Sequence, residues 1–197
     1  MTTVVEVRDL RKRYGEIEAV RSVSFTIREG ETFGFLGPNG AGKTTTISIL
    51  CTLIKSTDGS AEVGGFDVVT HPSEVPRRIG LVFQDPTLDD YLTAEENLRF
   101  HAELYGVPRA QTGPRIRQVL EMVELWGRRS SVVRTFSGGM RRRLEIARGL
   151  LHSPRALFLD EPTVGTGSAD THAHLELYRG AETPGADHDL PHDALHR

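Results

Sequence analysis

The stretch SGGMRRRLEIARGLLHSPRALFLDEPT, residues Ser137–Thr163, decides the fold of this chain. It joins a glycine turn, a basic helix and an apolar run, Leu157–Leu159, that ends in two adjacent acids, Asp160 and Glu161. An apolar strand followed by acids places carboxylates at the carboxyl end of a strand, where α/β sheets bind ligands. The stretch therefore predicts an α/β protein with acidic chemistry at one edge of its sheet.

A second motif lies far upstream: Gly37-Pro38-Asn39-Gly40-Ala41-Gly42-Lys43-Thr44 fits the phosphate-loop pattern G-x-x-x-x-G-K-[ST]. Glycines let backbone N–H groups turn toward phosphate oxygens, and a helix opening at Lys43 adds the positive end of its dipole. Lys43 supplies a cation to the β- and γ-phosphates, and the Thr44 hydroxyl reaches Mg²⁺. A glycine-rich turn with a chance lysine is the alternative, but a buried strand before the motif and a helix after it favour a nucleotide site.

The bulk composition sets limits on the class of protein. At 197 residues, with 38% hydrophobic and 26% charged residues, the chain can form one α/β domain with a core. A net charge of −3 argues against a general polyanion binder, and one cysteine excludes a disulfide framework. Because the sequence has no apolar run long enough for a bilayer and no signal-peptide pattern, we expect a soluble protein whose membrane role comes through a partner.

The periodicity of apolar residues gives an order of elements: antiparallel strands, phosphate loop and helix, a helical insertion, then a helix and a strand. No internal repeat is found, so we expect one nucleotide module. Strands are expected over 4–7, 20–27, 32–36, 60–69 (as a pair), 79–84 and 156–159. Helices are expected over 43–53, from 94 to about 126 with a break near 106–108 and a second helix from Pro114, and over 141–151.

Four further side chains are candidates for chemistry. Asp160 would hold Mg²⁺ through water, and Glu161 would polarise the attacking water as a general base. Gln84, at the end of the strand IGLVFQ, could reach the metal or the attacking water. Tyr14 could stack on a nucleobase. Taken singly, a glutamine that caps a strand and a surface tyrosine remain open alternatives.

Together these positions resemble the ATP-binding cassette (ABC) transporter ATPases. GPNGAGKTT, which includes Thr45, is similar to that family's Walker A, FSGGM to its signature loop and LFLDEPT to its Walker B. Gln84 matches the Q-loop and Tyr14 the adenine-stacking aromatic. The resemblance implies an α/β fold: a P-loop NTPase core with an antiparallel β subdomain and a helical subdomain over about 86–150, within a domain of residues 1–165.

The resemblance also implies a partner for the signature loop. In the family two copies pack head to tail, and Ser137, Gly138 and Gly139 of one copy contact the γ-phosphate held by the other. Arg141–Arg143 is then expected to be the solvated face of the following helix, and no nucleic acid is expected as a partner. Three residues are expected to form the buried stripe of that helix: Leu144, Ala147 and Leu151.

Within the family, FQDPTLDDYLTAEENL and LTAEENLRFHAELYGV resemble the drug- and lipid-exporter subgroup of the daunorubicin type. This subgroup implies an ATP-hydrolysing subunit with ATP and Mg²⁺ as cofactors. It would be cytoplasmic and peripheral on the inner face of the membrane, bound to a separate permease through the segment after Gln84. A soluble ABC protein acting on ribosomes or DNA, and a nucleotide-binding remnant without turnover, are the alternatives.

The resemblance stops after Gly165, where the family continues with Leu-Asp-Pro and later a switch histidine. This chain reads Thr166-Gly167-Ser168 instead, and residues 166–197 contain no Val, Ile, Phe, Met or Trp, so a tail without regular structure is expected. His188, His192 and His196 invite a metal-site interpretation, which Pro191 disfavours by interrupting the helix it needs.

A shifted reading frame would account for this departure. Offset by one base, free back-translation permits Leu-Asp-Pro after Gly165 and Thr-Thr-His near the end of the chain. We therefore hypothesise that a base was gained or lost near Gly165–Thr166. As written, the chain is expected to hydrolyse ATP weakly or not at all.

Overall fold

The computed structural model describes residues 2–35, 38, 40–82 and 87–159, and every structural statement below refers to these. The expectations for Gly37, Asn39, Gln84, Asp160 and Glu161 therefore lie outside the described residues, as do those for the segment 160–197 with its histidines.

Secondary structure covers most of the described chain. The strands are β1 (Thr3–Tyr14), β2 (Ile17–Arg28), β3 (Asp58–Val63), β4 (Phe66–Asp67), β5 (Ile79–Val82) and β6 (Ala156–Leu159). The α-helices are α1 (Lys43–Leu50), α2 (Ala94–Leu104), α3 (Arg109–Met122) and α4 (Gly138–Leu150). Single 3₁₀ turns span Val75–Arg78, Trp126–Arg128 and Val133–Thr135.

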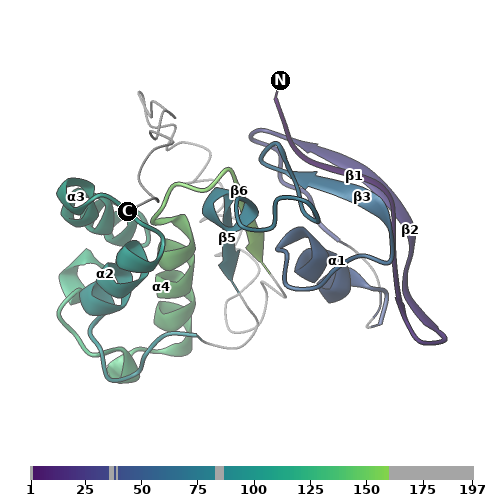
Figure 1. Ribbon diagram of the computed structural model, residues 1–197. Helices are drawn as coiled ribbons and strands as arrows, with labels where there is room; N and C mark the ends of the chain where they lie inside the picture. The colour runs from purple at the N-terminus through teal and green to yellow at the C-terminus, as the bar shows by residue number, and fades with distance from the viewer. Residues whose placement is uncertain (1, 36–37, 39, 83–86, 160–197) are drawn as a thin grey trace, which may run out of the picture.

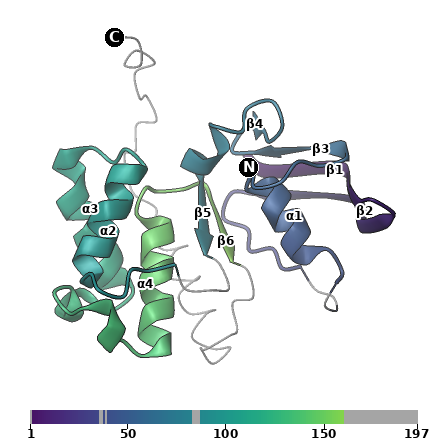
Figure 2. The ribbon, with the colours of Figure 1, turned by 60° about the horizontal axis from the view of Figure 1, so that its bottom comes forward.

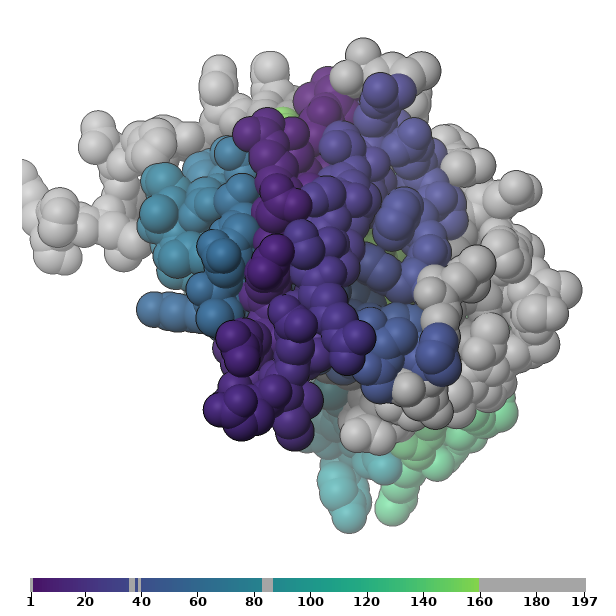
Figure 3. Space-filling model, turned by 90° about the vertical axis from the view of Figure 1, so that its right-hand side faces the viewer, coloured from purple at the N-terminus to yellow at the C-terminus, as the bar shows by residue number. Residues whose placement is uncertain are grey.

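An antiparallel sheet with the order β2-β1-β3-β4 forms one side of the molecule (Figure 1). Seen from that side, the purple strands β1 and β2 run the length of the face (Figure 3). They are longer than the apolar pattern predicts, because polar residues continue the hairpin as far as the pair Tyr14–Ile17. Val5, Val7 and Leu10 of β1 are buried in a core shared with α1.

The parallel pair β5 and β6 forms a wall between the two halves of the molecule, with α1 on one side and α4 on the other (Figures 1 and 2). Alternate side chains face opposite halves, as the period of a strand requires. Ile79, Leu81 and Phe158 join the core around α1, whereas Val82 and Leu157 join the core around the helices. Gly80 lets α4 approach β5, because a Cβ there would lie 2.3 Å from the Gly149 carbonyl oxygen.

Helices α2, α3 and α4 pack together on the far side of this wall. A capping box fixes the start of α2: the Thr93 side chain accepts from the Glu96 N–H, and the Glu96 carboxylate accepts from the Thr93 N–H. The structure corrects the start of α3, which begins at Arg109 and contains Pro114. Pro114 is the sixth residue of the helix and has no N–H, so the hydrogen bond that position 114 would donate to the Ala110 carbonyl oxygen is absent.

The expected α/β class is confirmed, and most expected elements are present. The expected buried strand over 32–36 is wrong for its described part. Residues 32–35 form no strand with any described residue, and Phe33 is 45% exposed. Its ring instead stacks on Phe25, with 4.8 Å between ring centroids. An apolar run cannot become a buried strand unless neighbours on both sides supply hydrogen bonds and cover.

Within the described ranges, none of the helices has both the length and the apolar character that a bilayer-spanning segment requires.

Candidate functional site

The phosphate loop turns back on itself around the side chain of its lysine. Lys43 Nζ donates to the Pro38 carbonyl oxygen at 2.9 Å, and the Ala41 N–H donates to the same oxygen at 3.2 Å. Lys43 opens α1, and the Thr46 N–H donates to the Gly42 carbonyl oxygen at 2.8 Å. The loop therefore places an ammonium group at the N-terminal, positive end of a helix, a combination that suits an anion.

Two glycines in this loop have backbones in the left-handed region. Gly40 and Gly42 both have φ of +83°. A Cβ on Gly42 would lie 2.3 Å from the Ala19 carbonyl oxygen of β2, whereas a Cβ on Gly40 would meet nothing within 4 Å. Glycine at position 42 thus lets the loop lie directly against β2, and glycine at position 40 leaves open space above the loop.

The threonines after Lys43 differ in their surroundings. Thr44 is exposed and Thr45 is half-buried. Thr46 is buried, and its hydroxyl donates to the Gly42 carbonyl oxygen at 2.8 Å. Of the three, Thr44 is the most exposed, and its expected role at Mg²⁺ stays a prediction.

Tyr14 lies at the end of β1, opposite Ile17 of β2, and is 49% exposed. Lys12 Nζ lies 4.8 Å from the centre of the Tyr14 ring, so a cation already sits over this aromatic side chain. The loop contacts β2 at Ala19, which places Tyr14 and the loop on the same hairpin.

The Ser137–Gly139 turn begins α4 on the other side of the β5–β6 wall. Ser137 is the N-cap, and its hydroxyl accepts from the Met140 N–H at 3.3 Å. Ser137 and Gly138 are exposed, and a Cβ on Gly138 or Gly139 would meet nothing within 4 Å. The wall between α1 and α4 keeps this turn apart from Lys43 within one copy of the chain (Figures 1 and 2).

The ends of β5 and β6 are register partners, Val82 opposite Leu159. Gln84 follows the first of these strands in the sequence, and Asp160 and Glu161 follow the second. The strands are parallel, so both described ends lie at the same edge of the pair. Among the described residues there is no group of three His, Cys, Asp or Glu side chains that could hold a metal ion.

Comparison with known proteins assigns the family. The ABC transporter family matches residues 20–164, which include the phosphate loop and the Ser137 turn. This chain belongs to the ABC transporter family.

One relative and two solved structures define the similarity of this ABC protein further. A doxorubicin resistance ATP-binding protein of Mycobacterium tuberculosis is 45% identical over 88% of this chain and 53% of its own length. The chain thus spans about half the length of the relative it matches.

The first structure, an ATP-binding subunit of an ABC transporter, is 32% identical with a TM-score of 0.79, over 90% of this chain and 74% of that one. The second, a dimeric ATP-binding cassette in a post-hydrolysis state with bound ADP and Pi, is 28% identical with a TM-score of 0.75. The alignment covers 88% of this chain and 81% of that one.

The structure corrects the expectation that Arg141–Arg143 forms a solvated face of α4. Arg142 is only 7% exposed and makes an ion pair with Glu145, their closest N and O atoms 3.4 Å apart. Arg141 pairs with Asp90, and Arg143 donates to the Val123 carbonyl oxygen. Packing of α4 between β5 and the other helices brings these positions into contact with neighbouring segments. The expected buried stripe, Leu144, Ala147 and Leu151, is confirmed.

The residues missed by sequence reasoning are Glu145 and Arg148 of α4. Both contact Thr87, the first described residue after the Gln84 segment. Burial lowers the pKa of the Arg148 guanidinium, and the charge of Glu145 acts in the opposite direction. Their signal in the sequence is a carboxylate and a guanidinium three residues apart, each directly after a residue of the buried stripe.

A stack of three rings lies where α2 meets the end of α4. Tyr105 stacks on both His101 and His152, each with 4.3 Å between ring centroids. His152 Nε2 lies 2.8 Å from the Ile79 carbonyl oxygen of β5. Burial, followed by the charges of Arg148 and His152, lowers the pKa of His101 to about 3, and burial also lowers the pKa of His152. These histidines are neutral packing residues at neutral pH.

Proposed function

We propose that this chain is the ATP-binding subunit of an ABC transporter and that it powers export of a drug, lipid or other small molecule through a separate permease. One observation carries the proposal: two glycine turns suited to phosphate lie on opposite sides of the β5–β6 wall. One turn holds Lys43, and the other caps α4 with Ser137.

The first half-site binds the triphosphate. The loop of residues 37–45 surrounds it with backbone N–H groups, and Lys43 exchanges its bond to the Pro38 carbonyl oxygen for phosphate oxygens. Tyr14 stacks on the adenine. Thr44, Gln84 and Asp160 would hold Mg²⁺, which neutralises charge on the β- and γ-phosphates. Glu161 accepts a proton from the attacking water, and Gln84 orients that water.

The second half-site comes from another copy of the chain. Because Ser137 and Lys43 are separated by the wall within one copy, Ser137, Gly138 and Gly139 serve the nucleotide of a head-to-tail partner. The open space around both glycines lets a phosphate approach the first turn of α4. The similarity to a dimeric cassette with bound ADP and Pi supports this arrangement.

The proposed location is the cytoplasmic face of the membrane, where the permease holds the subunit. The name of the doxorubicin resistance relative supports a role in drug export.

A nucleotide-binding remnant without turnover is the second candidate. The match to the family ends at Val164, just before the position from which the sequence departs from Leu-Asp-Pro. The frame-shift hypothesis explains the departure, and it fails if no one-base change in the coding DNA restores Leu-Asp-Pro and Thr-Thr-His.

Binding and hydrolysis measured on one preparation test the two candidates together. We expect wild-type protein to bind MgATP and Lys43→Ala to bind it about 10- to 100-fold more weakly, the range expected for loss of a charged hydrogen bond. Lys55→Ala, which removes a lysine outside the loop, should bind within about twofold of wild type. Phosphate release separates a working subunit from a remnant. Wild-type protein that binds no MgATP, or Lys43→Ala that binds as tightly as wild type, would contradict the proposal.

A further inference from the structure

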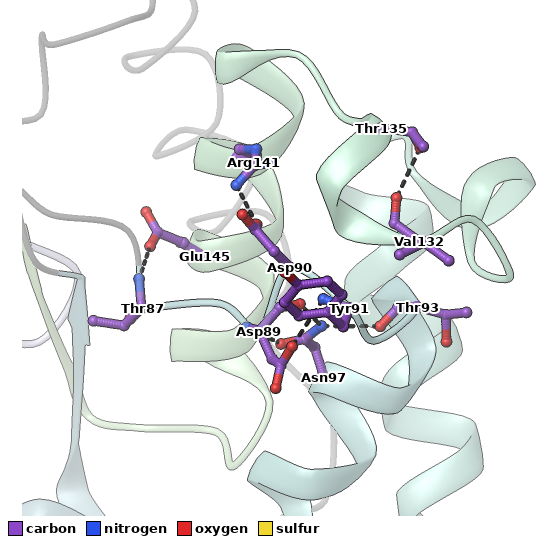
Figure 4. Close-up of polar contacts among 10 residues, drawn as sticks. All are labelled: Thr87, Asp89, Asp90, Tyr91, Thr93, Asn97, Val132, Thr135, Arg141 and Glu145. Atoms are coloured by element: carbon purple, nitrogen blue, oxygen red, sulfur yellow. Dashed lines mark hydrogen bonds and ion pairs between the residues drawn. The ribbon is translucent and has the colours of Figure 1, made fainter.

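The segment Thr87–Asp90, which follows the Gln84 segment in the chain, is fastened along one side of α4 (Figure 4). The Thr87 N–H donates to Glu145 Oε1 at 2.9 Å, and Arg148 Nη1 donates to the Thr87 carbonyl oxygen at 2.9 Å. Arg148 also contacts the Thr87 hydroxyl, and Arg141 pairs with Asp90. Positions 141, 145 and 148 share one face of the helix, so α4 holds this segment over two turns.

Helix α2 holds the same segment from another side. The Asp89 N–H donates to Asn97 Oδ1 at 2.9 Å. Asn97 Nδ2 donates to the Asp89 carbonyl oxygen at 3.0 Å and to the Thr93 carbonyl oxygen at 3.1 Å. Asn97 is buried, so its amide has little access to water and is committed to these bonds. The segment is therefore clamped between two helices.

Stability alone does not explain the buried carboxylate of Glu145 on the α4 side of the clamp. Glu145 is only 3% exposed, and the desolvation of a buried carboxylate offsets much of what its ion pair with Arg142 contributes. An apolar residue at position 145 would avoid that desolvation cost. A buried carboxylate fits better where a particular backbone N–H, here that of Thr87, must be held in one place.

The two ends of this arrangement belong to different half-sites of the proposed function. α4 begins at Ser137, which serves the nucleotide of the partner copy, and the clamped segment continues from Gln84, which serves the nucleotide of its own copy. The helix fastened to residues 87–90 connects the Ser137 turn physically with the residues that follow Gln84 in the chain.

We propose that Glu145 and Arg148 are positioning residues that hold residues 87–90 on α4, so that nucleotide contact at Ser137 and the order of residues 87–90 change together. The inference rests on the proposed function and adds to it a connection between the Ser137 turn and residues 87–90.

Amide hydrogen exchange on the full chain without nucleotide tests the holding contact. Glu145→Ala removes the acceptor of the Thr87 N–H, so exchange in residues 87–93 should become about tenfold faster, as expected for one hydrogen bond. Glu145→Gln retains an acceptor oxygen and should exchange like wild type. Glu121→Ala removes an exposed glutamate of α3 and should change nothing in residues 87–93.

Exchange with MgATP tests the connection. In wild-type protein, residues 87–93 and 137–144 should both become protected as MgATP is added. In Glu145→Ala, residues 137–144 should become protected, residues 87–93 should not, and the Kd for MgATP should stay within about twofold of wild type. If Glu145 had only a structural role, Glu145→Ala would lower the temperature of thermal unfolding but leave the protection of the two segments coupled. Glu145→Gln should restore the coupling.

Two results would overturn the inference: unchanged exchange of residues 87–93 in nucleotide-free Glu145→Ala, or the same MgATP protection of both segments in Glu145→Ala as in wild type. If Glu145→Ala does not fold, Arg148→Lys takes its place, because lysine lacks the two-pronged guanidinium that contacts both the Thr87 carbonyl and hydroxyl oxygens. The same two results in that variant would overturn the inference. Wild-type protein that binds no MgATP contradicts the proposed function instead, and the nucleotide-free measurement still decides whether Glu145 holds the segment.

Discussion

The two glycine turns of this protein differ in why they contain glycine. At Gly42 the fold itself requires it, because φ is +83° and a Cβ would lie 2.3 Å from the Ala19 carbonyl oxygen. At Gly138 and Gly139 the fold makes no such demand: neither has a positive φ, and a Cβ would meet nothing within 4 Å. Glycine in the second turn is therefore the stronger evidence for something that approaches from outside the chain.

The most severe test of this comparison is Gly42→Ala. The new Cβ adds a steric clash with β2 to the strain of a left-handed backbone, so the free energy of unfolding should fall by about 3–5 kcal/mol. Urea unfolding followed by circular dichroism measures the loss.

Gly40→Ala is the matched control for that variant. Position 40 has the same positive φ but no neighbour for a Cβ, so only the backbone strain remains, about 1–2 kcal/mol. Equal losses of unfolding free energy in the two variants would show that the contact between the loop and β2 does not contribute to the destabilisation by Gly42→Ala.

The halves that carry the two turns should also differ in their response to pH, because the stacked histidines belong to the half with α4. The pKa of His101 is about 3 in the folded protein, and in the unfolded chain it has its ordinary value near 6.5. Above pH 6.5 both states are neutral. Below it the unfolded chain binds a proton that the folded protein excludes, so stability should fall by up to about 1.4 kcal/mol per pH unit for this group until the pH nears 3.

His101→Phe keeps a ring against Tyr105 and removes the titrating group. Urea unfolding measures how much stability each protein loses between pH 7 and pH 5. The variant should lose about 2 kcal/mol less than wild type. An identical pH dependence in the variant and in wild type would show that His101 does not exclude the proton.

How far the sequence predicts this molecule also depends on the region. Around the phosphate loop, spacing and residue type are enough to predict secondary structure: the strand pair over 60–69 and the start of α1 at Lys43 match the expectation. Each depends on local chemistry, namely glycine conformation and helix initiation. The residues that would complete the site, Gln84, Asp160 and Glu161, lie outside the described residues and stay predictions.

The errors fall where distant segments decide the outcome. Residues 32–35 have the apolar pattern of a buried strand but no described strand pairs with them. Arg142 and Glu145 appear as surface charges in a helical pattern, yet α4 is covered on several sides by β5, α2 and α3, and these charges are buried. Local patterns could not reveal the contacts on Thr87, because Glu145 and Arg148 lie 58 and 61 residues away from it in the sequence.

A smaller effect is expected at the cap of the second turn. Ser137→Ala removes the acceptor of the Met140 N–H, and at 3.3 Å that bond is long, so the loss of stability should be about 0.5–1 kcal/mol. MgATP-dependent dimerisation, measured by analytical ultracentrifugation, should be lost nonetheless. Thr93→Ala is the matched control: it removes the cap of α2 and should destabilise at least as much while leaving dimerisation intact. Dimerisation that falls equally in both variants would assign the effect to stability.

The smallest change in stability, and the sharpest separation of fold from function, is expected for Gly138→Ala. Alanine is the better helix former and nothing lies within 4 Å of its Cβ, so the free energy of unfolding should rise by about 0.3–0.5 kcal/mol. The same methyl group would stand in the open space that the proposed function reserves for the partner's γ-phosphate, so MgATP-dependent dimerisation should disappear. A more stable protein that no longer dimerises would show that the methyl group meets something outside the folded chain. A variant that dimerises like wild type would remove the argument that glycine in this turn serves a phosphate.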